Sequence, residues 1–467
     1  MTDFDVIVLG LGPGGEHAAQ ELARAGKRVL GIDPALVGGE CPYYGCIPSK
    51  MILRGAEVLA EARRVEGLAG TSTVTPDLGP VATRIRDEAT DNWDDAVAVK
   101  RLEDLGATVV RGSGVLRGRN TTGALHVEVG DRTYSAPTVV LSTGTAPAIP
   151  PVPGLRELHA GRPDGIWTNR EAVKATGAPA SLIVLGGGAV GCELAQGFSR
   201  YGSQVTVIEA GPRLIAPEEP DASEVLESVF AREGIDVRTG IGAQAVALGG
   251  EGVEVTLAGG EVLIADVLLV AAGRKPNLGG VGLESIGLAD DLRVVEVDDH
   301  MQVVGGAATI DGLFAVGDIT GKGAFTHVAY WQADVLIDHL LEKPENFGGY
   351  RGIAWATFTD PEVGRVGLTE AGAREAGLSV RIGVQQIASN TRGWIHGRGN
   401  DGFVKVIEDA DRGVLVGATV IAPNGGEILG LLTLAVHAEV PTRTLLSMHY
   451  AYPTMHRAVR EALIALA

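Results

Sequence analysis

The sequence has few cysteines, few aromatic residues and an excess of acidic over basic residues. Three cysteines among 467 residues are too few for the disulfide framework of a small secreted protein. The 39 Lys and Arg residues face 58 Asp and Glu residues, and the net charge of −19 argues against a nucleic-acid partner. We find no apolar run of about 18 residues, so we expect no membrane span and no membrane partner.

The N-terminus also lacks the features of a targeting segment. Residues 1–5 are acidic, and the chain reaches its first glycine at Gly10, which is typical of neither a signal peptide nor a transit peptide. We therefore expect a cytoplasmic protein. Glycine, in contrast, is abundant at 67 residues, which indicates many tight turns and close backbone approaches.

Residues 38–50 read Gly-Gly-Glu-Cys-Pro-Tyr-Tyr-Gly-Cys-Ile-Pro-Ser-Lys and hold two of the three cysteines. Cys41 and Cys46 can reach bonding distance if Pro42 and Gly45 bend the chain. The apolar-periodic run that follows predicts a helix, with Cys46 near its positive end, where a thiolate is favoured. The pair is a candidate redox centre; the alternatives are two packed cysteines or half of a zinc site. No second cysteine pair or histidine cluster completes a zinc shell, so we predict no metal site.

A dinucleotide-binding pattern opens the chain. An apolar run at 4–9 leads into a G-x-G-x-x-G motif, an apolar-faced helix, and a second strand that ends in Asp33. The glycines let the backbone approach a pyrophosphate at the helix N-terminus, and Asp33 can accept hydrogen bonds from a ribose. A glycine-rich turn without a ligand is the alternative, and it explains this order of elements less well. The motif glycines are Gly10, Gly12 and Gly15.

The same pattern recurs after residue 181, with its second strand ending in Glu209. This acid follows the first glycine of its motif by 23 residues, as Asp33 does, so two dinucleotides are expected. Glu209 favours a free ribose 2′-hydroxyl and would repel a 2′-phosphate, which favours NADH, while Arg213 keeps NADPH as an alternative. Cys192 on the intervening helix is predicted to be structural. The motif glycines are Gly186, Gly188 and Gly191.

The remainder predicts one further site and a change of architecture. A strand at 313–316 leads into Gly317-Asp318, where the carboxylate would face a polyol hydroxyl or, alternatively, cap a helix. From about residue 348 strands and helices follow one another as in an α+β unit with an antiparallel sheet. The expected strands are 353–358, 380–387, 402–407 and 414–420, and the expected helices are 424–438 and 454–466.

Motifs occur in a fixed order at Gly10–Gly15, Gly39–Lys50, Thr143-Gly144, Gly186–Glu193, Gly273–Asn277, Gly317-Asp318, Thr359–Glu362 and Tyr452–Thr454. In this order they resemble the pyridine nucleotide–disulfide oxidoreductases, a flavoprotein family that includes dihydrolipoamide dehydrogenase and mercuric reductase. The resemblance covers the whole chain. It implies FAD in the first module, NAD(H) rather than NADP(H) in the second, and a homodimer formed by a C-terminal interface domain.

The resulting fold prediction is α/β, with two Rossmann-like dinucleotide-binding domains and a C-terminal α+β dimerisation domain. A proline cluster at 147–153 marks one border. The predicted domains are 1–152 for the first part of the FAD-binding domain, 153–275 for the NAD(P)-binding domain, 276–347 for a central domain that completes the FAD site, and 348–467 for dimerisation.

The resemblance also implies roles for individual residues. Cys46 would be the thiol against the flavin, and Cys41 the interchange thiol exposed to substrate. Lys50 and Glu193 would pair beside the flavin and the nicotinamide, which the sequence pattern alone does not predict. Asp33 and Asp318 would bind the FAD ribose and ribityl chain, and the other cofactor-binding residues are Gly39, Lys50, Thr143, Gly144, Gly273, Arg274 and His327.

The chain departs from the family at its C-terminus. Disulfide-reducing members carry a His-Pro-Thr segment with an acid five residues after the histidine, whereas this chain has Tyr452 and Arg457 at those positions. A tyrosine, with a reference pKa of about 10, is a poor base at neutral pH. His456 would share a helix face with Tyr452 if the helix has already started, and could replace the missing base. The pair Tyr43-Tyr44 is also bulkier than the small residues usual between the cysteines.

We therefore predict an NAD(P)H oxidoreductase that uses FAD and Cys41–Cys46 to reduce a small acceptor, such as a quinone, dye or metal ion, without the usual histidine. The alternatives are a dihydrolipoamide dehydrogenase or other disulfide reductase, and a non-catalytic flavin sensor. Unlike mercuric reductases, the chain is expected to start directly with its FAD module, and it ends without a cysteine pair, so efficient Hg(II) reduction is not expected.

Overall fold

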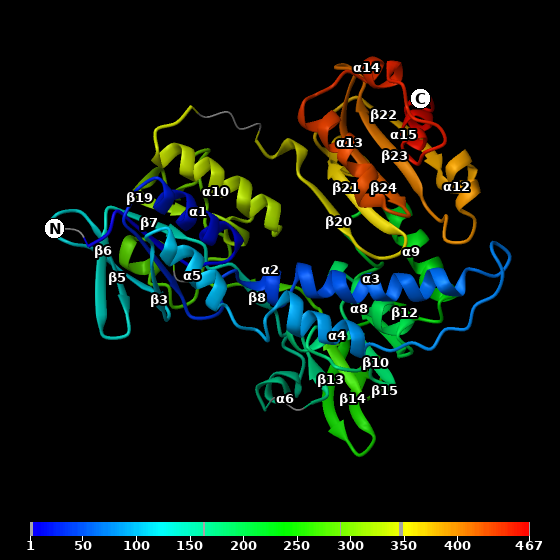
Figure 1. The fold of residues 1–467 in the computed structure, drawn as a ribbon, viewed down its shortest axis with the longest axis horizontal. Coiled ribbons are helices and arrows are strands. Elements are labelled where there is room, and N and C mark those ends of the chain that lie inside the picture. Colours follow the sequence, from blue (N-terminus) through cyan, green and yellow to red (C-terminus); the bar gives the residue numbers. More distant parts are fainter. Residues whose placement is uncertain (1–2, 162–163, 290, 345–348, 467) are drawn as a thin grey trace. The chain divides into compact units, whose positions relative to one another are not determined.

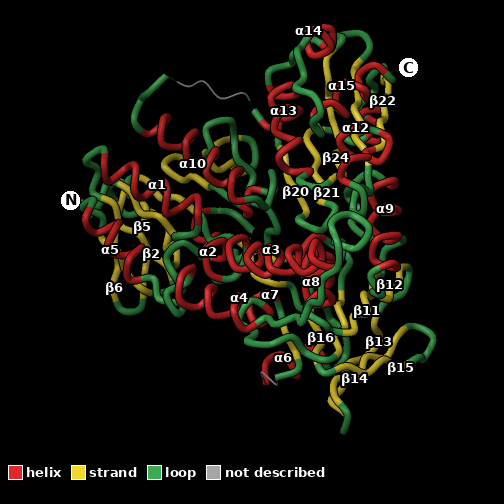
Figure 2. The backbone as a smooth tube through the Cα atoms, turned by 45° about the vertical axis from the view of Figure 1, so that its right-hand side comes forward, coloured by secondary structure: helices red, strands yellow, loops and turns green. Residues whose placement is uncertain are grey.

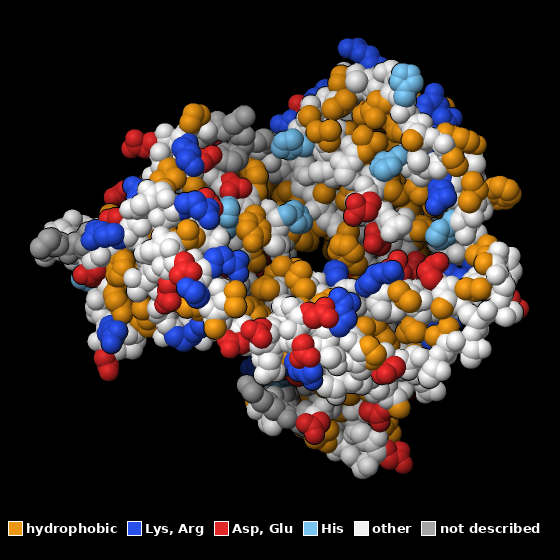
Figure 3. Space-filling model, in the orientation of Figure 1, with side chains coloured by type: hydrophobic (Ala, Val, Ile, Leu, Met, Phe, Trp, Pro, Cys, Tyr) orange, Lys and Arg blue, Asp and Glu red, His pale blue; other side chains and the backbone are white. Residues whose placement is uncertain are grey.

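The structure, a computed structural model, describes residues 3–161, 164–289, 291–344 and 349–466. The chain divides into two compact units. The first contains residues 1–48, 84–147 and 274–347, and the second contains residues 49–83, 148–273 and 348–467. On the face shown in Figure 3, acidic and basic side chains are interspersed. None of the described helices is both long enough and apolar enough to cross a membrane.

The first unit is built on a six-stranded sheet with the order β18-β19-β7-β1-β2-β3. All neighbours are parallel except β18 and β19. Strand β1 is buried along its whole length, because its apolar run is covered on both faces. The strands are β1 (Val6–Leu9), β2 (Val29–Asp33), β3 (Thr108–Arg111), β7 (Thr138–Leu141), β18 (Gln302–Gly305) and β19 (Ala308–Ala315). Residues 302–315 thus belong to the same sheet as the N-terminal module.

Two helices of this unit, α1 (Pro13–Arg24) and α10 (Thr326–Leu340), lie side by side (Figure 1). His17 of α1 lies 2.7 Å from Asp334 of α10. Helix α1 carries Pro13 in its first turn, where its missing N–H costs no hydrogen bond. The unit also contains α2 (Glu40–Tyr43), a π-helix (Ile85–Ala89), α5 (Ala96–Asp104), a meander of β4 (Val115–Arg119), β5 (Leu125–Val129) and β6 (Arg132–Ala136), and the pair β8 (Thr145–Pro147) and β17 (Arg274–Pro276). Helix α4 (Gly79–Arg84) belongs to the second unit except for Arg84.

The second unit contains a parallel sheet with the order β12-β11-β10-β16-β9. Helix α3 (Cys46–Arg63), which begins in the first unit, continues into this one beside α8 (Ala189–Arg200) (Figures 1 and 2). The strands are β9 (Ile166–Trp167), β10 (Ser181–Leu185), β11 (Gln204–Glu209), β12 (Asp236–Thr239) and β16 (Val267–Val270). Other elements are α6 (Leu155–Gly161), α7 (Asn169–Ala172), α9 (Pro220–Arg232), and a meander of β13 (Ala243–Gly249), β14 (Gly252–Leu257) and β15 (Val262–Ala265).

Residues 349–466 form an antiparallel sheet with the order β20-β21-β24-β23-β22 and an apolar core against α13 and α15. The predicted α+β class and four of the strands are confirmed. Strand β21, directly after Pro361, was missed because a proline-containing segment reads as a turn. The elements are β20 (Ala354–Thr357), β21 (Glu362–Gly367), β22 (Val380–Gln386), β23 (Phe403–Asp409), β24 (Val414–Ala422), α11 (Glu370–Glu375), α12 (Thr391–His396), α13 (Gly425–His437), α14 (Thr442–Ser447) and α15 (His456–Ile464).

Candidate functional site

The two predicted redox cysteines lie on two consecutive helices. Cys41 is in the short helix α2, and Cys46 is the first residue of α3, where the positive end of the helix favours a thiolate. Both are thiols here, the reduced form of the predicted pair. Cys41 is half-buried and Cys46 is exposed. Cys41 is covered because α2 packs it into the fold, whereas Cys46 stands at a helix end.

Thr326, which the sequence analysis did not identify, contacts both sulfurs. Its Oγ1 lies 3.4 Å from the Sγ of Cys46, and its side chain also hydrogen-bonds the Cys41 sulfur. The hydrogen bond from Cys41 to Cys46, followed by burial, raises the pKa of the Cys41 thiol well above its ordinary value. The raised pKa favours the protonated form of the Cys41 thiol.

Lys50 and Glu193 form an ion pair in the second unit. The Nζ of Lys50 lies 2.7 Å from Oε2 of Glu193, whose side chain is only 6 % exposed. The backbone N–H of Phe358 donates to Oε1 of Glu193 at 2.8 Å, and the Lys50 ammonium lies 4.7 Å from the centroid of the Phe358 ring. The carboxylate therefore has a partner at each oxygen, and the lysine charge is fixed between an acid and an aromatic face.

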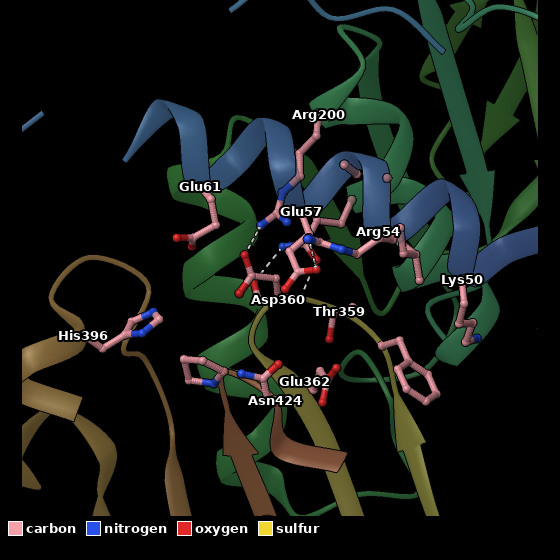
Figure 4. Close-up of a pocket in the computed structure, with 16 residues that line it drawn as sticks. Lys50, Arg54, Glu57, Glu61, Arg200, Thr359, Asp360, Glu362, His396 and Asn424 are labelled. Carbon is pink, nitrogen blue, oxygen red and sulfur yellow. Dashed lines mark hydrogen bonds and ion pairs between the residues drawn. The ribbon is translucent and has the colours of Figure 1, made fainter. Parts of the chain in front are cut away.

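Lys50 also lines a cavity of about 450 Å³ in the second unit (Figure 4). Its wall is strongly charged, but opposite charges are paired within it. Arg54 lies 2.9 Å from Glu57, and Arg200 lies 2.9 Å from Asp360. In Figure 4, Lys50 and His396 lie at opposite sides of the cavity.

The first glycine motif has the geometry that a bound dinucleotide requires. A Cβ on Gly10 would lie 2.3 Å from the carbonyl oxygen of Ser142, and one on Gly15 would lie 2.0 Å from that of Gly10. Gly12, by contrast, has open space at its Cβ position, where a phosphate can approach the backbone. The Asp33 carboxylate accepts the N–H of Leu11 at 2.6 Å, and burial raises its pKa.

Further residues fit the rest of FAD in the first unit. The Oγ1 of Thr143 is buried and has no hydrogen-bond partner among the described residues, so a bound polar group can satisfy it. Asp318 accepts the Thr145 hydroxyl at 2.6 Å and caps no helix, which excludes the capping alternative. Arg274 donates to the same hydroxyl at 2.6 Å, and the exposed His327 stacks on Phe325 at 5.4 Å. Gly39 is required because a Cβ there would lie 2.8 Å from the Cα of Gly12.

The second glycine motif repeats the first. A Cβ on Gly186 would lie 2.4 Å from the Ala271 oxygen, one on Gly191 would lie 1.9 Å from the Gly186 oxygen, and Gly188 has open space. Glu209 accepts the N–H of Gly187 at 2.6 Å, as Asp33 accepts that of Leu11. The residues present therefore fit a second dinucleotide. Gly273, at the end of this module, has a positive φ of 107° and open space beside it.

Arg213 and Cys192 are both engaged within the second unit. The Arg213 guanidinium donates to the Ser223 hydroxyl at 2.8 Å and to the carbonyl oxygens of Ala216 and Glu218 at 2.5 and 2.8 Å. Cys192 is fully buried, which raises its pKa, and donates to the Gly187 oxygen at 3.3 Å. Arg213 is thus committed to its own loop.

The C-terminal segment places Tyr452 before the last helix. Tyr452 is 66 % exposed, and its hydroxyl lies 3.3 Å from Oγ1 of Thr391. Helix α15 begins only at His456, so Tyr452 lies outside the helix and the condition for a shared helix face is not met. The reason is Pro453, because a residue that precedes proline is disfavoured in the helical conformation. The guanidinium of Arg457 lies 5.7 Å from the centroid of the Tyr452 ring.

Comparisons with known proteins cover both units. Residues 4–333 match the pyridine nucleotide-disulphide oxidoreductase family model, and residues 353–463 match the dimerisation domain of the same family. A dihydrolipoyl dehydrogenase from Thermus scotoductus is 33 % identical over 478 residues, covering 100 % of this chain and 98 % of that protein. One from Chlorobaculum tepidum is 32 % identical over 468 residues, covering 99 % and 96 %.

Solved structures of other proteins share the fold of this chain over nearly its whole length. LpdA from Mycobacterium tuberculosis superposes with a TM-score of 0.85 at 26 % identity, covering 99 % of both chains. The HOCl-induced flavoprotein disulfide reductase RclA from Escherichia coli superposes with a TM-score of 0.83 at 24 % identity, again over 99 % of both chains, which shows a common fold.

Proposed function

The chain belongs to the pyridine nucleotide-disulphide oxidoreductase family, and from this premise we propose that it oxidises NADH and reduces a small acceptor without a histidine base. It is an FAD- and NAD(P)H-dependent flavoprotein oxidoreductase with a dimerisation domain, and the proposed assembly is a homodimer. The proposed acceptor is a quinone, dye or metal ion. Acceptors of this kind are not thiols, so their reduction does not require a protein group that removes a proton from a thiol.

The proposed mechanism assigns a task to each contact described above. Bound FAD supplies a two-electron relay between the nicotinamide and the Cys41–Cys46 pair. Helix α3 and the Thr326 hydroxyl stabilise negative charge on the Cys46 sulfur, while Cys41 holds the proton. Glu193 fixes the orientation of the Lys50 side chain. The positive charge of Lys50 then stabilises any negative charge that develops beside it during hydride transfer. In total NADH and one proton deliver two electrons and two protons to a quinone.

The nicotinamide coenzyme is NADH in this proposal. Glu209 presents a carboxylate at the ribose position, and Arg213 donates its guanidinium hydrogens to its own loop and to Ser223. The Glu209 carboxylate by itself repels a 2′-phosphate, and this repulsion is sufficient to explain the preference for NADH.

The single observation that carries the acceptor proposal is the exposed Tyr452 with Arg457 against its ring. A phenol is a poor proton acceptor at neutral pH, and a positioned base is typically worth about 10²–10⁴-fold in rate. The dithiol and the Lys50–Glu193 pair are intact, so electrons can reach the cysteines even though proton transfer to a thiol substrate lacks its usual group.

A second candidate is dihydrolipoamide dehydrogenase. The observation that favours it is the name of the relatives that are 32 and 33 % identical over nearly the whole chain. In that case His456, the exposed first residue of α15, would have to replace the missing base. The enzyme names of these relatives count against the alternative of a non-catalytic sensor.

Steady-state assays of the wild type and of Tyr452→His/Arg457→Glu separate the two candidates. We expect the wild type to reduce a water-soluble quinone with NADH, and to reduce NAD⁺ with dihydrolipoamide at least about 100-fold more slowly than the double variant. Quinone reduction should be the same in both proteins. Rapid dihydrolipoamide oxidation by the wild type would reject the proposal, and its loss in His456→Ala would establish the second candidate.

A further inference from the structure

The segment between the cysteines is held by a second segment that the mechanism above does not use. Tyr43 follows Cys41 by two residues and is 7 % exposed. Its ring packs on Gly38, whose Cβ position would lie 3.3 Å from the Cε2 atom of Tyr43. Its carbonyl oxygen accepts the indole N–H of Trp93 at 3.0 Å. Because Tyr43 is the last residue of α2, this carbonyl lacks a partner within the helix, and Trp93 supplies one.

A strained turn positions this indole. Asp91, Asn92 and Trp93 have positive φ angles of 46°, 54° and 57°, so three successive non-glycine residues adopt the left-handed conformation. Asp and Asn tolerate it, but for a bulky residue such as tryptophan it is a clear outlier. The turn directly follows a π-helix, which is itself a rare element. Such strain persists only where the surrounding structure enforces it, and it concentrates at functional sites.

One further contact fixes the turn itself, and another joins the residues just after it to the redox segment. Thr90, which is 1 % exposed, accepts the backbone N–H of Trp93 at 3.3 Å. Asp95 accepts the backbone N–H of Val37 at 2.6 Å, just before the glycines that precede Cys41, and is itself fixed by Arg111 at 2.6 Å. Residues 93–95 thus hold the redox segment on both sides of Cys41, through the bond of Asp95 to Val37 and the bond of Trp93 to Tyr43.

From this arrangement we propose that Trp93 is a positioning residue for the Cys41–Cys46 pair, which sets the stability of the sulfur–sulfur bond. The inference rests on the proposed redox role of the two cysteines. By fixing the end of α2, the indole keeps the two sulfurs at high effective concentration, which favours the bond over the dithiol. Loss of the N–H leaves the Tyr43 carbonyl without its partner, loosens the segment and makes the bond easier to reduce.

The test uses the FAD-loaded protein in buffers of graded reduced and oxidised dithiothreitol. Each reduction breaks the sulfur–sulfur bond with two electrons and two protons from reduced dithiothreitol, which closes to its cyclic disulfide. Alkylation and mass spectrometry then give the fraction of Cys41 and Cys46 present as thiols. We expect Trp93→Phe to shift the equilibrium about fivefold toward the dithiol, which is about 20 mV at about 30 mV per tenfold change.

Two variants make the result specific. Trp167→Phe is the matched control, because the Trp167 indole also donates to a backbone carbonyl, that of Asp164 at 2.9 Å, but belongs to the second unit. It should not move the equilibrium. Trp93→His keeps a ring N–H and should recover part of the shift, while retained FAD absorbance shows that each variant is folded.

The outcomes distinguish this inference from the proposed function. A wild-type pair that forms the bond, with an unchanged equilibrium in Trp93→Phe, would overturn the inference alone. An equal shift in Trp167→Phe would also overturn it, because the effect would then be a general loss of stability. A wild type in which Cys41 and Cys46 never form a bond would overturn the proposed function and the inference together.

Discussion

The ammonium of Lys50 lies 2.7 Å from the carboxylate of Glu193, although 143 residues separate them along the chain. The acid is nearly buried, whereas 35 % of the lysine side chain is exposed. The two partners therefore differ in their surroundings. The buried negative charge of Glu193 is compensated by Lys50 and by the Phe358 N–H, whereas the Lys50 side chain remains in contact with solvent. This asymmetry decides what each substitution should do.

Replacement of Glu193 by glutamine should destabilise the protein, because it removes the charge that holds Lys50. We expect the free energy of unfolding in urea to fall by about 1–3 kcal/mol, less than for a fully buried pair, because Lys50 is partly solvated. Glu57→Gln is the control, since Glu57 pairs with Arg54 on the exposed face of α3 and should change stability by less than about 0.5 kcal/mol. Equal effects in both variants would contradict this account.

Thr326→Val keeps the shape of the side chain but removes the hydroxyl from both sulfurs. A hydrogen bond to a charged group contributes about 1.5–3 kcal/mol, so the thiolate form of the pair should become at least about tenfold rarer at neutral pH. The measurement is the rate of iodoacetamide alkylation of the reduced protein as a function of pH. The midpoint of this pH profile should rise by about one pH unit. Thr433→Val, which removes a hydroxyl bonded to the Leu429 carbonyl in α13, should leave the profile unchanged.

Coenzyme preference should resist a single substitution at Glu209. Glu209→Ser removes the repulsive carboxylate, but Arg213 stays bonded to Ser223 and to its own loop. We therefore expect kcat/KM for NADH to fall about tenfold and kcat/KM for NADPH to rise by less than about tenfold. Glu209→Ser/Ser223→Ala, which also releases one guanidinium bond, should raise the NADPH value further. Full NADPH activity in Glu209→Ser would show that Arg213 can bind a 2′-phosphate without losing its hydrogen bond to Ser223.

Tyr201 makes stability depend on alkaline pH. Burial raises the pKa of Tyr201 to about 12, from an ordinary value near 10. Because the folded-state pKa is the higher one, the stabilisation is complete below pH about 10 and is lost as the pH rises towards 12, by up to about 2.7 kcal/mol.

Tyr201→Phe tests this dependence. The variant loses the hydrogen bond to the Ile52 carbonyl, 3.1 Å long, so at pH 7 it should be about 1 kcal/mol less stable than the wild type. Near pH 12 the difference should vanish or reverse. Parallel stability curves for both proteins between pH 9 and 12 would contradict the assignment.

Sequence reasoning identified the features that are encoded locally. Each glycine motif and its acid lie within one strand–helix–strand unit, so their spacing alone specifies the backbone approach and the acid-to-backbone bond seen at Asp33 and Glu209. The start of α3 at Cys46 follows for the same reason, since helix boundaries depend on neighbouring residues. The family and its two cofactors followed from the order of these motifs.

Contacts between residues that are far apart in the sequence could not be predicted from local spacing. The sequence pattern did not place Thr326 at the sulfurs or Trp93 at the Tyr43 carbonyl, because these partners are 280 and 50 residues apart. Spacing alone would allow Tyr452 and His456 to share a helix face, but the residue before Pro453 is disfavoured in a helix, and α15 begins only at His456.

The sequence by itself determined the two nucleotide modules, the spacing of Cys41 and Cys46, and the presence of Tyr452 before Pro453-Thr454, because each depends on residue types at short spacing. Only the tertiary structure decided which hydroxyl lies at the Cys46 sulfur, what holds Lys50 and how the segment around Cys41 is supported. The physical reason is that hydrogen bonds and ion pairs act over a few ångströms, and chain topology alone determines which distant residues come that close.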